Sequence, residues 1–144
     1  MAAEPRARML TEFYSLMNRI LLVEDDEDLC ELMHNILQND GYEIEIANNG
    51  AQALALDFVE PANLVITDVF MPKINGLETI VELRKQNPNL RFIAISGGGK
   101  ETLSLARKMG AHATLEKPFS CDRLLQAVSK LIGYSRRFPR PSPV

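Results

Sequence analysis

Acidic, hydroxyl and amine side chains stand directly after short apolar runs of this chain, and they are Glu24, Asp25, Asp26, Asp68, Ser96 and Lys117. Carboxylates gathered in one partly desolvated place repel each other, and a hard divalent cation such as Mg²⁺ relieves that repulsion. The set contains no histidine or cysteine, so it does not indicate zinc. A lysine ammonium and a hydroxyl are donors suited to the oxygens of a transferring phosphoryl group. The combination predicts Mg²⁺-assisted transfer of a phosphoryl group onto the carboxylate of Asp68.

Short β-branched runs alternate with longer amphipathic segments between residues 19 and 133. The apolar runs predict strands at residues 19–23, 42–47, 64–67, 91–95 and 113–115. Apolar residues at three- and four-residue spacing predict helices at about residues 26–38, 51–60, 75–86, 101–109 and 120–132. Glutamates interrupt the apolar residues of 42–47, so that strand is expected near an edge of the sheet.

Five strand–helix units of this kind predict an α/β fold with a parallel sheet covered by helices on both faces. Right-handed crossovers place the carboxyl ends of the strands along one edge. Ligands of such sheets bind in the crevice outside that edge. The acids after the first and third strands, the serine after the fourth and the lysine after the fifth should therefore meet there.

Composition excludes several classes of protein. The 144-residue chain is 46% apolar and 24% charged, which is ordinary for one globular domain, and no apolar run is long enough to span a membrane. The first ten residues lack the apolar stretch of a secretory signal. Cys30 and Cys121 are far apart and are expected at semi-buried helix positions as small hydrophobes. With no disulfide framework, a cytoplasmic location is predicted.

Charge is distributed unevenly along the chain. Residues 19–133 hold 11 bases and 17 acids, giving −6, whereas residues 134–144 hold three arginines and no acid. An acidic domain is a poor candidate for direct nucleic-acid binding. Residues 1–18 are expected to form a poorly ordered extension or a short helix, and the basic, proline-rich residues 134–144 a disordered tail.

The motifs together resemble the receiver domain of two-component response regulators. They are Val23-Glu24-Asp25-Asp26, residues 68–76 beginning Asp68-Val69-Phe70, Ser96-Gly97-Gly98 and Lys117-Pro118-Phe119. The resemblance covers about residues 19–133, and the motifs occur in the family's order. It implies a doubly wound five-stranded parallel sheet in the order 2-1-3-4-5 with five helices, a flavodoxin-like three-layer sandwich.

The resemblance also assigns roles at the expected site. Asp68 corresponds to the phospho-acceptor, and Asp25 to the direct Mg²⁺ ligand. Glu24 would act on the ion through water, and the backbone carbonyl of Phe70 would complete the protein's share of the coordination. Phe70 is also large and apolar, and we expect it to hamper the in-line approach of water to a phosphorylated Asp68.

Further roles concern the signal itself. Lys117 corresponds to the lysine that pairs with the acceptor, and the Lys117-Pro118 bond is expected to be cis. Ser96 corresponds to the hydroxyl that follows the phosphoryl oxygen. Thr114 departs from the pattern, because many receivers carry Tyr or Phe three residues before the lysine. Thr114 is too small for an aromatic switch, so we expect activation to act on residues 97–109, where three successive glycines give the backbone unusual freedom.

The leading prediction is a stand-alone receiver that accepts its phosphoryl group from a histidine kinase or a histidine phosphotransfer protein. It is not expected to be an enzyme with a turnover substrate, to contact nucleic acid directly or to insert into a membrane. Its output is expected through contacts with an unknown downstream protein, at the face formed by the fourth helix and the fifth strand.

The same residues allow other interpretations. The acids after residue 23 also suit a helix N-terminus, and Asp26 suits its cap. Residues 96–100 fail the Walker phosphate-loop pattern, since Glu101 follows Lys100. A haloacid-type phosphohydrolase usually has a second aspartate two residues after the nucleophile, where this chain has Phe70. A receiver-like interaction module that is not phosphorylated remains the alternative. His34 and His112 are expected to be structural or surface residues rather than phospho-donors.

Overall fold

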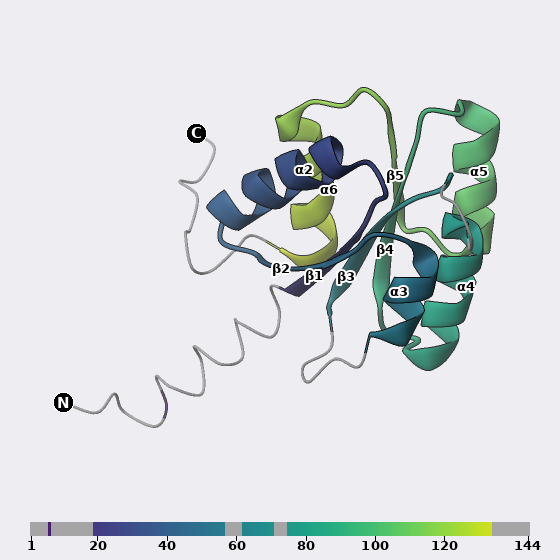
Figure 1. Ribbon diagram of the computed structural model, residues 1–144, viewed down its shortest axis with the longest axis horizontal. Helices are drawn as coiled ribbons and strands as arrows, with labels where there is room; N and C mark the ends of the chain where they lie inside the picture. The colour runs from purple at the N-terminus through teal and green to yellow at the C-terminus, as the bar shows by residue number, and fades with distance from the viewer. Residues whose placement is uncertain (1–5, 7–18, 57–61, 71–74, 134–144) are drawn as a thin grey trace.

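The computed structural model describes residue 6 and residues 19–56, 62–70 and 75–133. Five strands and five helices alternate within these described residues (Figure 1). In chain order they are β1 (Arg19–Val23), α2 (Glu27–Asn39), β2 (Glu43–Ala47), α3 (Gly50–Ala55), β3 (Leu64–Asp68), α4 (Gly76–Gln86), β4 (Arg91–Ser96), α5 (Lys100–Met109), β5 (Ala113–Glu116) and α6 (Cys121–Ile132). The extensions predicted at residues 1–18 and 134–144 lie outside the described residues, Arg6 excepted.

The five strands form one parallel sheet in the order β2-β1-β3-β4-β5. Leu22 of β1 lies opposite Ile46 of β2 on one side and Ile66 of β3 on the other. This arrangement confirms the predicted fold and strand order. It also brings the carboxyl ends of all five strands to one edge, and it places β2 at a border of the sheet, as its glutamates predicted.

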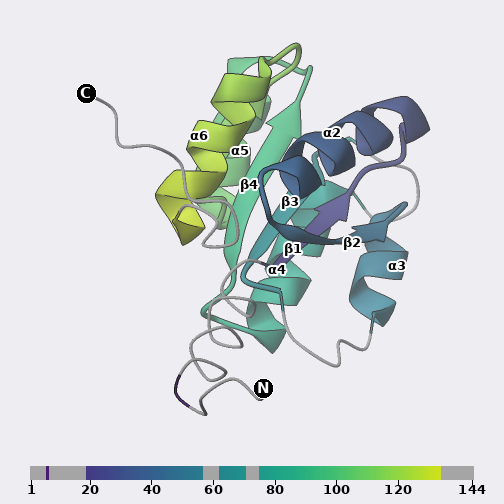
Figure 2. The ribbon, with the colours of Figure 1, turned by 90° about the vertical axis from the view of Figure 1, so that its left-hand side faces the viewer.

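Alternation along the buried strands separates two apolar cores. Ile20 and Leu22 face one core with α2 and α6, whereas Leu21 and Val23 face the other with α3, α4 and α5. Figure 1 and Figure 2 show these helices on opposite sides of the sheet. Because both faces are covered, the inner strands β1 and β3 are almost entirely buried and are apolar except at Arg19, Thr67 and Asp68.

Side-chain caps fix where four of the helices begin. Asp26, Asn49, Asn75 and Ser120 each accept a hydrogen bond from the backbone N–H of the third helical residue. Such caps satisfy donors that a helix leaves unpaired at its N-terminus. The cap at Asp26 confirms that this acid serves the helix, which distinguishes it from Glu24 and Asp25 just before it.

The helix predicted at residues 51–60 was too long. Within the described residues α3 ends at Ala55, and Leu56 is extended with ψ 123°. Leu54 and Leu56, two residues apart, both pack against the second core. A continuous helix would turn side chains at this spacing to different faces, so the extended backbone at Leu56 is what brings both to the core. Residues 57–61 lie outside the described part of the chain.

Smaller differences concern strand ends and the two cysteines. Tyr42 precedes β2 rather than starting it, and β3, β4 and β5 each extend one residue further than predicted, to Asp68, Ser96 and Glu116. Both cysteines were expected to be semi-buried. Cys30 is buried instead, and Cys121 is exposed at the start of α6. No helix in the described residues is long and apolar enough to cross a membrane.

Candidate functional site at the carboxyl edge of the sheet

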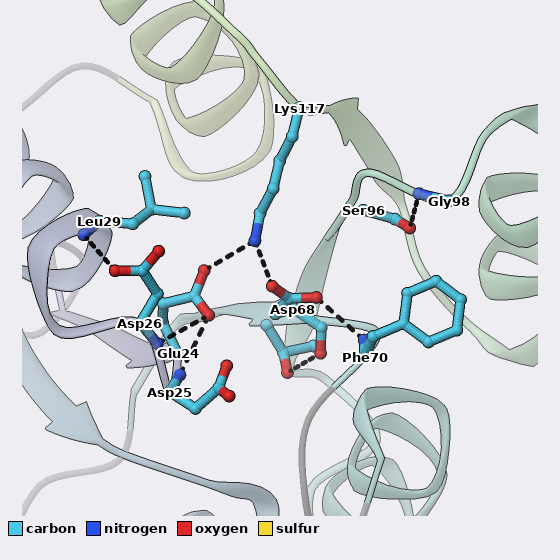
Figure 3. A network of polar contacts seen from close by, with 10 residues as sticks. Glu24, Asp25, Asp26, Leu29, Asp68, Phe70, Ser96, Gly98 and Lys117 are labelled. Atoms are coloured by element: carbon cyan, nitrogen blue, oxygen red, sulfur yellow. Dashed lines mark hydrogen bonds and ion pairs between the residues drawn. The ribbon is translucent and has the colours of Figure 1, made fainter.

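The sheet brings the predicted site residues to one edge. Glu24 and Asp25 follow β1, Asp68 ends β3, Ser96 ends β4 and Lys117 follows β5. Figure 3 shows their side chains converging from these separate strands. The topology therefore gathers the residues that the sequence predicted to meet, although up to 93 positions separate them along the chain.

Lys117 is held between two carboxylates. Its Nζ donates to Oδ2 of Asp68 in a very short contact and to Oε1 of Glu24 at 3.1 Å (Figure 3). Burial alone would lower the pKa of Lys117, but the hydrogen bonds and charges of Asp68 and Glu24 outweigh burial and raise it. The ammonium group therefore stays charged and fixes the orientation of both carboxylates. The Lys117-Pro118 bond is cis, as the resemblance implied.

Asp68 is nearly buried at the end of β3, and both of its carboxylate oxygens have partners. While Oδ2 meets Lys117, Oδ1 accepts a hydrogen bond from the backbone N–H of Phe70 at 2.9 Å. These two contacts hold the carboxylate in one orientation at the mouth of the site.

Glu24 is the most deeply buried acid of the site, with 1% of its surface exposed. Its Oε2 accepts from the backbone N–H groups of Asp25 at 3.0 Å and Asp26 at 3.4 Å. Burial, followed by the charge of Asp68, raises the pKa of Glu24 well above its ordinary value. Two carboxylates in one partly desolvated place thus resist being charged together.

Three carboxylates form a set that suits a hard cation. Oxygen atoms of Glu24, Asp25 and Asp68 all lie within 4.8 Å of one another, and Asp25 is exposed to solvent. Oxygen donors with no nitrogen or sulfur are the ligands that Mg²⁺ prefers. The cluster thus fits the ion that the sequence predicted. Such an ion would reduce the repulsion between the carboxylates that contributes to the raised pKa of Glu24.

Ser96 is fully buried at the end of β4 and positions the loop that follows. Its Oγ accepts from the backbone N–H of Gly98 at 2.9 Å, and its carbonyl accepts from the backbone N–H of Lys117 at 2.9 Å. Ser96 therefore links the loop before α5 to the strand end that carries the lysine.

Phe70 and Gly98 make a contact that sequence reasoning missed. The Phe70 ring is 60% exposed, yet a Cβ on Gly98 would lie 2.5 Å from its Cε2. The loop after β3 thus packs on the loop after β4 beside the acceptor carboxylate (Figure 3). The sequence predicted only backbone freedom for the glycine run, whereas its second glycine also leaves room for the Phe70 ring.

Gly76 has a second role of the same kind. A Cβ at this position would lie 2.0 Å from the carbonyl oxygen of Asp68, and its N–H donates to the carbonyl of Val69 at 2.9 Å. Only glycine lets the first turn of α4 approach the acceptor strand this closely. The sequence predicted only that a helix starts at about residue 75. A glycine directly after a helix cap was the available signal.

The remaining candidates lie away from the acids. Thr114 is half-buried on β5, where its Oγ1 accepts from Nη2 of Arg107 at 3.4 Å. His112 accepts a hydrogen bond at Nδ1 from the backbone N–H of Phe92, and His34 lies on α2. Neither histidine belongs to the carboxylate cluster, in agreement with the sequence.

A parallel α/β sheet with a lysine clamped between carboxylates at its carboxyl edge defines the class of this protein, and comparison with known proteins defines the family. The profile of the response regulator receiver domain matches residues 20–129. The chain belongs to this family of two-component signalling proteins.

Individual relatives agree with this membership. The transcriptional regulatory protein CpxR homolog of Haemophilus influenzae is 37% identical, over 88% of this chain and 54% of its own length. The receiver domain of NtrX from Brucella abortus is 35% identical with a TM-score of 0.73, covering 78% of this chain and 97% of that one. The Thermotoga maritima response regulator TrrA, solved in complex with Mg²⁺-BeF, is 37% identical with a TM-score of 0.72. The match covers 79% of this chain and 98% of that one. The chain spans about half the length of the curated relatives it matches.

Proposed function

We propose that Asp68 accepts a phosphoryl group from a phosphohistidine, with Mg²⁺ bound beside it. The observation that carries this proposal is the position of Lys117, whose Nζ bridges Asp68 and Glu24 from the end of a different strand. A lone carboxylate at a strand end is common. A carboxylate held by an ammonium group next to two further acids matches the requirements of phosphoryl transfer.

The transfer exchanges one bond for another. An oxygen of Asp68 attacks the phosphorus, the bond from phosphorus to the donor's imidazole nitrogen breaks, and the imidazole keeps the electron pair of that bond. Lys117 then pairs with the negative charge that the phosphoryl group brings. The Ser96 hydroxyl, at the end of the adjacent strand, is the group proposed to follow a phosphoryl oxygen.

Glu24, Asp25, Asp68 and the backbone carbonyl of Phe70 are the groups proposed to hold the Mg²⁺. When bound, the ion supplies positive charge to the phosphoryl oxygens and to the crowded carboxylates. The 4.8 Å clustering of the three acids supports this assignment, and the relative solved with Mg²⁺-BeF supports it by similarity.

The partners proposed are a histidine kinase or histidine phosphotransfer protein upstream and a protein target downstream. We propose no turnover substrate, since the site would act only on its own phosphoryl group. Direct contact with nucleic acid is not proposed for residues 19–133, which carry a net charge of −6. A cytoplasmic location and independent action of the domain stay predictions.

Intact-mass measurement after incubation with acetyl phosphate and Mg²⁺ tests this function. The wild-type chain is expected to gain the mass of one phosphoryl group, and Asp68→Asn is expected to gain none. Asp122→Asn, which neutralises an exposed acid in the first turn of α6, is the matched control and should gain the group as the wild type does.

Other outcomes would contradict the proposal. A mass gain that persists in Asp68→Asn would place the acceptor elsewhere. A folded wild-type chain that gains no mass from acetyl phosphate or from phosphorylated histidine kinases would favour an interaction module that is not phosphorylated.

A further inference from the structure

The outer edge of β2 presents backbone groups that can bond to a further strand. Among the described residues, β2 pairs only with β1. The carbonyl of Ala47 accepts from the N–H of Glu24, so Ala47 turns its backbone groups toward β1, and so does Glu45 two residues earlier. The N–H and carbonyl groups of Ile44 and Ile46 therefore face outward, where an added strand can reach them.

The two faces of this border differ in their chemistry. Ile44 packs against the core under α2 and α6, and Ile46 shares that face with 41% of its surface exposed. Glu43 and Glu45 lie on the opposite face. Glu43 pairs with Arg19 at 2.8 Å, whereas no base within the described residues forms an ion pair with Glu45. A segment that covers this border therefore needs positive charge on one face and apolar surface on the other.

The chain leaves α6 next to the start of β2 (Figure 1). The hydroxyl of the buried Tyr42, directly before β2, donates to the carbonyl of Gly133 at 2.9 Å. Gly133, at φ 78°, ends α6, and residues 134–144 follow it. Eleven extended residues span about 36 Å, roughly twice the ~17 Å of a five-residue strand such as β2. This segment is therefore long enough to run along β2 from its first residue to its last.

A strand in this place would also have the usual handedness of parallel sheets. α2 and α6 pack on the same face of the sheet. The connection from β1 through α2 leads the chain across this face to β2, and a connection from β5 through α6 to the outside of β2 runs in the same direction. Both connections therefore have the same hand, and parallel crossovers are almost always right-handed. The added strand would be parallel to β2.

The prolines of residues 134–144 are compatible with a border strand. Pro139, Pro141 and Pro143 occupy alternate positions. In a strand, all three positions that lack an N–H would turn to the same side, away from β2, as prolines in border strands do. Arg136 and Arg140 occupy the other set of alternate positions, so their backbone groups would face β2.

The chirality of the chain then decides which face these arginines occupy. In parallel strands of L-residues, positions whose backbone groups point in the same direction carry their side chains on the same face. Glu43 and Glu45 point from β2 toward β1, and Arg136 and Arg140 would point the same way, from the added strand toward β2. The two arginines would therefore stand beside the two glutamates. The alternate prolines would stand beside the exposed Ile46.

We propose that residues 134–144 add to β2 as a sixth, parallel strand, with Arg136 and Arg140 next to Glu43 and Glu45. The sequence alone predicts a disordered tail, because three prolines exclude a helix, but their alternation permits a border strand. The opposite charges of the tail and of β2 favour the added strand. The proposal does not depend on phosphorylation of Asp68, so each can be tested without the other.

Hydrogen exchange of single amides, followed by NMR on the full 144-residue chain, tests the proposal. In the reversed tail, Arg136→Glu with Arg140→Glu, attraction to β2 becomes repulsion. The outward amides of Ile44 and Ile46 should then exchange about tenfold faster than in the wild type, because they lose their partner strand. The amide of Glu45, which faces β1, is the internal reference and should change by less than about twofold.

Two further variants separate an added strand from general charge attraction. Arg137→Glu with Lys108→Glu makes the same change of net charge, but Arg137 falls with the prolines and Lys108 lies on α5. This control should leave the two isoleucine amides within about twofold of the wild type. Glu45→Arg, added to the reversed tail, restores opposite charges across the border and should slow exchange of both amides by about threefold or more.

Three results would overturn the proposal. The amides of Ile44 and Ile46 could exchange equally fast in the wild type and the reversed tail. The control variant could accelerate them as much as the reversed tail does, which would identify general charge attraction. Their protection in the wild type could rise with protein concentration, which would show that another molecule covers β2 rather than the tail of the same chain.

Discussion

The ring of Phe70 occupies the space that a side chain on residue 98 would need, since a Cβ on Gly98 would lie 2.5 Å from its Cε2. This contact joins the loops after β3 and β4 directly beside the carboxylate of Asp68. We expect a large exposed ring in this position to restrict the directions from which water can approach a phosphoryl group on Asp68.

Removal of the Phe70 ring should therefore speed loss of the phosphoryl group. We expect Phe70→Asn and Phe70→Glu to shorten the lifetime of phosphorylated Asp68 by several-fold, measured by intact mass after the donor is removed. Leu105→Asn removes an exposed apolar side chain from α5, away from the carboxylates, and should leave the lifetime unchanged. An equal or longer lifetime in the Phe70 variants would contradict this role.

The close approach of α4 to β3 predicts a steric effect on stability. In Gly76→Ala the new Cβ would meet the carbonyl oxygen of Asp68 at 2.0 Å, so backbone must shift. We expect the free energy of unfolding to fall by about 2 kcal/mol or more in urea titrations. Gly97→Ala is the matched control, because its nearest neighbour would be at 3.9 Å, and its change should stay within about 0.5 kcal/mol. Equal effects of the two substitutions would refute the steric explanation.

The carboxylate cluster predicts stabilisation by Mg²⁺. At about ten times its Kd, the ion should raise the free energy of unfolding by about 1.4 kcal/mol, seen as a rise in Tm. Asp25→Asn should abolish most of this rise. Asp26→Asn keeps a side-chain oxygen that can cap α2, since Asn caps helices about as well as Asp, and it should keep the response to Mg²⁺. A full response in Asp25→Asn would remove that residue from the proposed ligands.

The pH dependence of stability should carry a contribution from His112. Burial, followed by the charges of Arg91 and Arg84, lowers its pKa below the ordinary 6.5. The unfolded chain then binds the proton more readily, so this contribution is present above pH 6.5 and is lost as pH falls through the lowered pKa. His112→Gln should show a smaller loss of stability between pH 7 and lower pH than wild type, by urea titration at each pH. A loss in His112→Gln as large as that of the wild type would contradict the assignment.

Phosphorylation should alter the segment from residue 97 to residue 109. Ser96 holds this loop through Gly98, Gly99 lies at φ 91°, and α5 begins without a side-chain cap. A hydroxyl drawn toward a phosphoryl group would release its bond to the Gly98 N–H. Hydrogen exchange, with and without phosphorylation, should change most in this segment. Unchanged protection there would reject this path for the signal.

Sequence reasoning predicted correctly those features that depend on the order of apolar and polar residues along the chain. Continuous apolar runs predicted the buried strands, and Asp26 was correctly expected to suit the cap of a helix. Parallel topology then brought Asp68 near Lys117, because strand ends share one edge. The end of α3 and the exposure of Cys121 were missed. Apolar periodicity shows which face of a helix is buried, but it does not show where the helix ends or how far along the helix that burial extends. The Phe70–Gly98 and Gly76–Asp68 contacts depend on loop positions in space, and residue types alone do not specify those.

The position of β2 at a border of the sheet has a consequence for the behaviour of concentrated solutions. A strand at the border of a sheet has one unpaired edge, and this edge can recruit the same strand of another molecule and start a fibril. Here Glu45 projects into solvent from that strand, and Glu43 beside it is paired with Arg19. Two molecules that approached border to border through β2 would bring their exposed Glu45 carboxylates together, and this repulsion disfavours edge-to-edge pairing.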